Sequence, residues 1–188
     1  MQNAQCRVQN TGLIFSSFCT LHCAFCTLRG LTLLIYTTPE DLRAEPDARR
    51  FWLLGIMTCL RDRADRMEVR FGDGDATLYN RVQGRDWELT PVSEELFETL
   101  KPTVRGFSRL VTPQRPDFTI TAGLPDVRTE PQEIGWLTFE LEQHLIDLPV
   151  RIDPREPYGF IQVDFEYPEE MELAGLAGAA LAEYYELD

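Results

Sequence analysis

The chain has 188 residues, of which 44% are hydrophobic and 26% charged, as in a soluble globular protein with one hydrophobic core. Its formal net charge of −13 argues against a nucleic-acid partner, because phosphate binding needs a concentrated basic surface. Lys101 is the only lysine, and it does not follow a glycine-rich loop, which excludes a P-loop NTPase within this chain.

Residues 1–41 form an apolar, cysteine-rich appendage that we expect to be separate from the globular domain. Residues 11–38 carry little charge, but Arg29 and Gly30 interrupt them, and neither part reaches the roughly 20 apolar residues of a spanning helix. We expect the appendage to be disordered or translated from an over-extended start, with membrane contact only through residues 11–38. The odd number of cysteines, five, favours the reducing cytoplasm over a disulfide framework.

Three of these cysteines, Cys19, Cys23 and Cys26, have a spacing that resembles the signature of radical S-adenosylmethionine enzymes. That resemblance implies a metal site in which the three thiolates hold a 4Fe–4S cluster that binds S-adenosylmethionine. The residues that follow show neither repeated βα units nor a Gly-Gly-Glu motif. We therefore prefer a chain without cofactors and keep the iron–sulfur protein as an alternative.

A helix followed by a β-hairpin is predicted at the start of the globular domain. Apolar residues recur at helical spacing over residues 46–63. Apolar and charged residues then alternate over residues 67–71, which is the pattern of a half-buried strand. The Gly-Asp-Gly-Asp sequence at residues 72–75 provides the turn to a second strand over residues 76–82.

Further elements are predicted on both sides of the middle of the chain. Residues 86–89 form a short third strand, and Ser93 caps a helix that Pro102 should end or kink. Near the end, residues 158–165 are densely apolar and predict a central strand. A last helix over residues 168–186 has glycines and alanines that leave a flat surface for close packing, in the same chain or on a partner.

Residues 129–148 allow two interpretations, of which we prefer a helix. Thr129 and Gln132 have the spacing of a helix N-terminus, and apolar residues then recur at intervals of three or four. The alternative is a strand over residues 136–141. His144 falls in this segment, and we interpret it as a surface or packing residue because no Cys/His spacing links it to a zinc pattern.

The order of helix, hairpin and helix resembles the domain that precedes the motor domain in type II secretion and type IV pilus ATPases. The similarity covers roughly residues 46–166. Residues 64–68 occupy the place of the family's Ala-Ser/Thr-Asp-Ile-His pattern, and residues 79–84 that of Arg-x-Arg-x-Asp-Gly. Residues 109–117 correspond loosely to a following Arg-Leu-Pro-Gln-Asp-Gly-Arg loop.

The resemblance implies a module without catalytic activity of its own. In the family, arginines of this domain reach a nucleotide held by the adjacent motor domain, so Arg81, Arg109 and Arg115 are candidate nucleotide contacts in trans. Two signature residues differ, because Gln83 replaces an aspartate and Phe160 replaces a glutamate. The resemblance therefore implies a domain that is retained as a scaffold, with no catalytic residues.

Together these observations predict a single α+β domain over residues 42–188, with an antiparallel sheet of about five strands packed by three or four helices. No nucleophile–base pair emerges from the sequence, so we expect a non-catalytic protein-interaction or regulatory module. Its expected partner is a second copy or a secretion-type ATPase. A second alternative is an acidic secretion chaperone, suggested by the size, the low pI of about 4.6 and the helix–hairpin–helix order.

Overall fold

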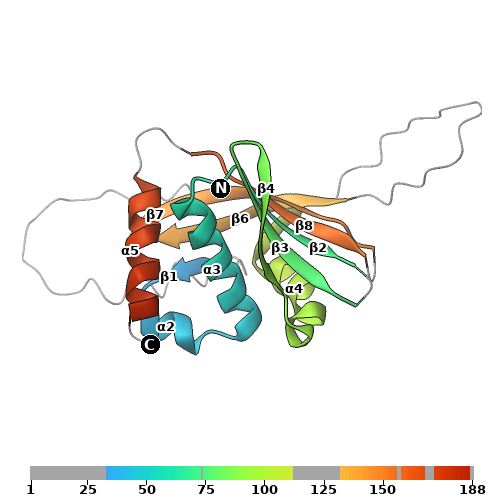
Figure 1. The fold of residues 1–188 in the computed structure, drawn as a ribbon, viewed down its shortest axis with the longest axis horizontal. Coiled ribbons are helices and arrows are strands. Elements are labelled where there is room, and N and C mark those ends of the chain that lie inside the picture. Colours follow the sequence, from blue (N-terminus) through green and yellow to red (C-terminus); the bar gives the residue numbers. More distant parts are fainter. Residues whose placement is uncertain (1–32, 73, 112–131, 156–157, 168–171, 187–188) are drawn as a thin grey trace, which may run out of the picture. The chain divides into compact units, whose positions relative to one another are not determined.

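The computed structural model describes residues 33–72, 74–111, 132–155, 158–167 and 172–186 (Figure 1). These residues belong to one compact unit, residues 31–188. Their elements, in chain order, are β1 (Leu34–Tyr36), α2 (Pro39–Ala44), α3 (Asp47–Arg61), β2 (Arg66–Phe71), β3 (Ala76–Val82), β4 (Arg85–Pro91), α4 (Glu94–Phe107), β5 (Ser108–Val111), β6 (Glu133–Leu141), β7 (His144–Ile152), β8 (Gly159–Asp164) and α5 (Leu173–Glu186). The first described element, β1, begins at Leu34, which lies before residue 42, where we expected the globular domain to start.

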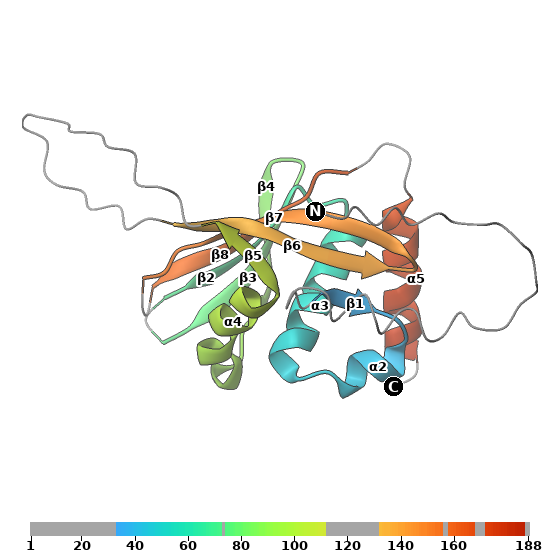
Figure 2. The ribbon, with the colours of Figure 1, turned by 180° about the vertical axis from the view of Figure 1, so that it is seen from behind.

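The described strands form one sheet in the order β1-β6-β7-β8-β2-β3-β4. β5 pairs with the first part of β6, and β1 pairs with its last part, so both short strands lie along the edge of β6 that faces away from β7 (Figure 2). The β1–β6 pair is parallel and every other pair is antiparallel. The α+β class is confirmed. The prediction of an antiparallel sheet of about five strands is partly wrong, because the described residues form eight strands and the β1–β6 pair is parallel.

The largest difference from the sequence prediction is the β6–β7 hairpin, which replaces the helix expected over residues 129–148. The apolar residues that face the core recur every second position, from Gly135 to Leu141 and from Ile146 to Ile152. The turn between the strands consists of Glu142 and Gln143, both with positive φ, 46° and 71°. Such a turn usually contains glycine or asparagine, so the sequence lacked the usual hairpin signal.

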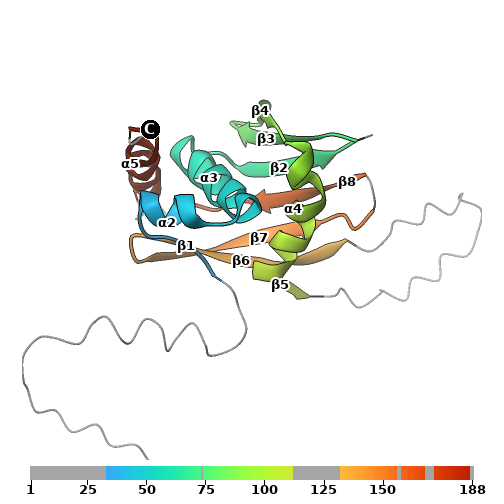
Figure 3. The ribbon, with the colours of Figure 1, turned by 90° about the horizontal axis from the view of Figure 1, so that it is seen from below.

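The core lies between the sheet and the helices, which cover one of its faces (Figure 3). Met67, Val69 and Phe71 of β2 point toward the helices and are buried, whereas the charged residues between them are not. Trp52 of α3 is completely buried in this core. Gly55 of α3 allows the close approach of β2, since a Cβ atom there would lie 2.5 Å from Met67 Cε. The predicted α3 and β2–β3 hairpin are therefore confirmed.

α4 continues past Pro102 to Phe107, so of the two expected effects of this proline, an end or a kink, the end does not occur. A proline inside a helix removes one backbone hydrogen bond. Leu100, Val104 and Phe107 lie on both sides of it and are buried against the core. The burial of these side chains contributes more to stability than the missing backbone hydrogen bond removes.

Candidate interaction surface

The second face of the sheet carries no described helix (Figure 3). The side chains that point to this face from β2, β3, β6 and β7 are mostly polar or aromatic. We call this surface the open face. The strand register places one residue from each of seven strands in a single row across it. In order from β5 to β4, these are Val111, Ile134, Arg151, Gln162, Glu68, Tyr79 and Glu88. The row is apolar at the β5–β6 end and charged in the middle.

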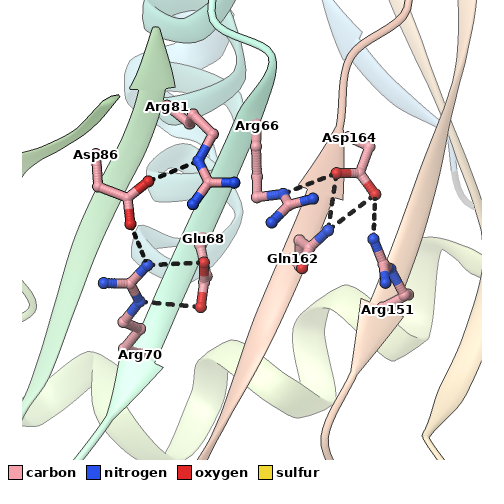
Figure 4. A network of polar contacts seen from close by, with 8 residues as sticks. All are labelled: Arg66, Glu68, Arg70, Arg81, Asp86, Arg151, Gln162 and Asp164. Carbon is pink, nitrogen blue, oxygen red and sulfur yellow. Dashed lines mark hydrogen bonds and ion pairs between the residues drawn. The ribbon is translucent and has the colours of Figure 1, made fainter. Parts of the chain in front are cut away.

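The charged residues in the middle of the open face form two groups, and the first group is built around Asp86 of β4 (Figure 4). Arg81 Nε donates to Asp86 Oδ1 at 2.7 Å, and Arg70 Nη2 donates to Oδ2 at 2.7 Å. Arg70 also donates from Nε to Glu68 at 3.0 Å and lies over the ring of Tyr79. The hydrogen bonds from Arg81 and then Arg70 lower the pKa of Asp86 to about 2. This carboxylate is therefore ionised throughout the physiological range and fixes both guanidinium groups.

The second group is built around Asp164 of β8, which joins strands on both of its sides (Figure 4). Arg66 Nε of β2 donates to Asp164 Oδ1 at 2.9 Å, and Arg151 Nη2 of β7 donates to Oδ2 at 3.0 Å. The amide of Gln162 donates to the same carboxylate. Partial burial of Asp164 opposes ionisation, but the hydrogen bonds from Arg151, Arg66 and Gln162 outweigh it and hold its pKa below the usual range.

A groove of about 510 Å³ lies at the apolar end of the open face. It is lined by residues of β5, β6 and β7 and by the residue that follows Phe165, and these are Arg109, Leu110, Val111, Trp136, Asp147, Pro149 and Glu166. Asp147 accepts hydrogen bonds from Arg109 Nη2 at 3.1 Å and from Thr138 Oγ1 at 2.5 Å. Trp136 is directly opposite Pro149 in the β6–β7 register.

The apolar residues around this groove are unusually exposed for their size. Trp136 is 43% exposed, and Val111 and Ile134, which pair across β5 and β6, are 55% and 41% exposed. Scattered apolar residues on a surface need no explanation, but a group of them on adjacent strands is a candidate contact surface. This group lies beside an ordered set of charged residues, as in protein–protein interfaces.

The candidate nucleotide-contact arginines are not brought together. Arg81 of β3 and Arg109 of β5 both lie on the open face, but β2, β8, β7 and β6 separate them, which corresponds to roughly 24 Å at the usual strand spacing. Each is bound to a carboxylate, Asp86 or Asp147. Arg115 lies outside the described residues, as do the candidate metal ligands Cys19, Cys23 and Cys26.

Trp136 was missed as a site residue because its segment was assigned to a helix. Its neighbours Gly135 and Leu137 are both buried, so the period-2 pattern of β6 was the signal that could have found it. In β2, every second residue is charged, at Arg66, Glu68 and Arg70. Since every second residue of a strand points to one face, this pattern indicates a charged face of the sheet.

No protein-family model matches the chain, and no curated protein is significantly similar to it. None of the helices among the described residues is long and apolar enough to cross a membrane. The chemistry of the open face is therefore the basis for the functional argument.

Proposed function

We propose that the chain is a non-catalytic protein-interaction or regulatory module that binds its partner through the open face of the sheet. The observation that carries this proposal is the exposed Trp136 in a groove, beside arginines that are fixed by carboxylates. Tryptophan and arginine dominate the binding energy of protein interfaces, where rigid side chains lose little entropy on binding.

The proposed partner is a second copy of the chain or a secretion-type ATPase, and the proposed location is the cytoplasm. The resemblance to the pre-motor domain rests on the order helix, hairpin, helix, and the chain has α3, the β2–β3 hairpin, β4 and α4 in this order. A nucleotide contact in trans by Arg81 or Arg109 remains a prediction. Because the two arginines lie on β3 and β5, with four strands between them, one phosphate group cannot contact both.

A site-specific photo-crosslinker tests this proposal in the full chain. The reactive residue is placed at Ile134 on the open face, and a matched control is placed at Tyr185 of α5, which is 59% exposed. We expect one crosslinked species from position 134, identified by mass spectrometry as this chain or as an ATPase. The proposal would be contradicted if position 134 gave no crosslinked product, or if positions 134 and 185 gave the same products.

An acidic secretion chaperone is a second candidate, and the state of β4 favours it. All seven residues of β4 are exposed, Trp87 is 56% exposed, and β3 is its only neighbour among the described strands. An extended peptide can add a strand to such an edge. Slower amide hydrogen exchange in residues 85–91 on addition of a secreted protein would support this candidate, and slower exchange in residues 134–151 alone would contradict it.

A further inference from the structure

We propose that the groove beside Trp136 binds a basic side chain, an arginine or a lysine, of the partner segment. This inference rests on the proposed function and specifies the chemistry of the partner at that surface. The groove combines aromatic and apolar side chains with the carboxylate of Glu166, which has no partner among the described residues, and these are the two features that recognise an organic cation.

The groove is lined by Trp136 and Pro149, which lie opposite each other on β6 and β7, and by Val111 of β5, which pairs with Ile134. Arg109 is the β5 residue directly opposite Trp136, and its guanidinium group is bound to Asp147. The face of an indole ring attracts guanidinium and ammonium groups that lie within about 6 Å of its centre, and tryptophan is the strongest of the aromatic residues in this respect. The apolar neighbours suit the methylene stem of the same side chain, since arginine and lysine bury their stems along apolar surface.

The charge of the groove comes from two carboxylates and one guanidinium group. Asp147 is already bound by Arg109 and Thr138. Glu166 is exposed, and no described residue forms a hydrogen bond or ion pair with it. The lining therefore carries one negative charge in excess, and a single cation placed between Glu166 and Trp136 would neutralise it.

The charge of the whole chain favours the same ligand. A net charge of −13 attracts a basic segment over long range and repels an acidic one. An acidic ligand at this groove would also be repelled by the exposed carboxylate of Glu166. The partner segment that fits is therefore basic, with apolar residues near the basic one to cover Val111 and Ile134.

The test uses a short capped peptide with one arginine between two leucines, and a twin in which neutral citrulline replaces the arginine. Binding to the full chain is followed by NMR at the indole N–H of Trp136, which is assigned among the three tryptophans by single replacements with phenylalanine. We expect the arginine peptide to shift this signal in a saturable way. Equal affinity of the citrulline twin would overturn the proposal.

Two variants with the same change in net charge separate local recognition from general attraction. Glu166→Gln should lower the affinity for the arginine peptide by about threefold, which corresponds to the loss of one exposed ion pair. Glu88→Gln removes an exposed carboxylate at the far end of the open face and should leave the affinity within about 1.5-fold of the parent chain. Equal weakening by the two variants would show general attraction and overturn the proposal.

Two further outcomes define what a failure means. Agmatine, a free guanidinium compound, should bind more weakly than the peptide, and equal affinity would identify a site for a small molecule instead of a protein segment. If the peptide does not bind but the crosslink from position 134 still forms, the cation site is overturned and the proposed function is not. Loss of that crosslinking as well would overturn the proposed function.

Discussion

Arg66 and Arg81 lie directly opposite each other on β2 and β3, and each directs its Nε away from the other, toward a carboxylate on the next strand. Like charges that face each other across two strands destabilise a sheet. Asp164 on β8 and Asp86 on β4 offset this repulsion from either side. The open face therefore owes its fixed arginines to two carboxylates that the sequence did not single out.

Asp164→Asn should destabilise the fold, because Arg66 and Arg151 then lose the anion that they share. The carboxylate is partly buried, and we expect a loss of about 1–2 kcal/mol in the free energy of unfolding, measured with urea. Glu88→Gln removes an exposed carboxylate without a described partner and should change stability by less than about 0.5 kcal/mol. Equal effects of the two variants would show that the bridge contributes nothing.

Acid should unfold the chain over the range in which these carboxylates take up protons. The pKa of Asp86 is about 2 in the fold against an ordinary 3.8, and the pKa of Asp164 is also lowered. A lowered pKa in the folded state contributes stability that is fully present above the ordinary value and is lost as the pH falls through the folded one. Stability should therefore decrease from about pH 4 to about pH 2.

The double variant Asp86→Asn, Asp164→Asn provides the control for this pH dependence. It lacks both carboxylates, so thermal unfolding followed by circular dichroism should show a shallower decrease over the same pH range. An unchanged decrease in this variant would assign the acid sensitivity to other groups.

Lys101→Met should loosen the connection between β7 and β8. The Lys101 ammonium is buried, donates to the carbonyls of Arg155 and Tyr158 at 2.6 and 3.0 Å, and lies over the ring of Phe71. Methionine fills the space without donating, and we expect a loss of about 2–3 kcal/mol. Thr99→Ala, at an exposed position of the same helix, should cost less than about 0.5 kcal/mol.

Hydrogen exchange locates this effect within the fold. In the Lys101→Met variant, the amides of β8, which follows the β7–β8 connection, should show a larger increase in exchange rate over the parent chain than the amides of α3. Uniform acceleration across the chain would instead indicate a general loss of stability, and unchanged exchange in β8 would contradict the role of Lys101.

Gly135→Ala should displace β5 from β6 and abolish the groove. A Cβ atom at Gly135 would lie 2.2 Å from the carbonyl oxygen of Arg109, which the backbone cannot accommodate without moving β5. Gly106→Ala is the control, because a Cβ atom there meets nothing within 4 Å inside helix α4, and alanine should leave stability unchanged or raise it by up to about 1 kcal/mol. The arginine peptide should lose its binding to the Gly135 variant only.

The sequence predicted the elements whose turns and periods are unambiguous. The β2–β3 hairpin was found because glycines at positions 72 and 74 mark its turn. The β6–β7 hairpin was missed because Glu142 and Gln143 adopt positive φ without glycine. Leucines at positions 137, 141, 145 and 148 happen to recur at helical intervals, although the first two and the last are buried by strand alternation and Leu145 is exposed.

The candidate site was predicted only in part, because it depends on the β6–β7 hairpin that the sequence did not indicate. Arg81 and Arg109 were selected from a resemblance, and both lie on the open face. Their carboxylate partners come from residues 5 and 38 positions away, and the second pair exists only because β5, β6 and β7 are neighbours. The exposure of Trp136 depends on the same hairpin, so a prediction that lacked the hairpin could not place the groove.

The yield of the crosslink from position 134 in a Trp136→Ala chain tests whether the partner binds at Trp136. Trp136 is 43% exposed, and the melting temperature of the Trp136→Ala chain establishes that it is folded under the conditions of the crosslinking. We expect the crosslink yield to fall by at least about tenfold, as for a central tryptophan of an interface. An unchanged yield from a folded Trp136→Ala chain would contradict binding at Trp136.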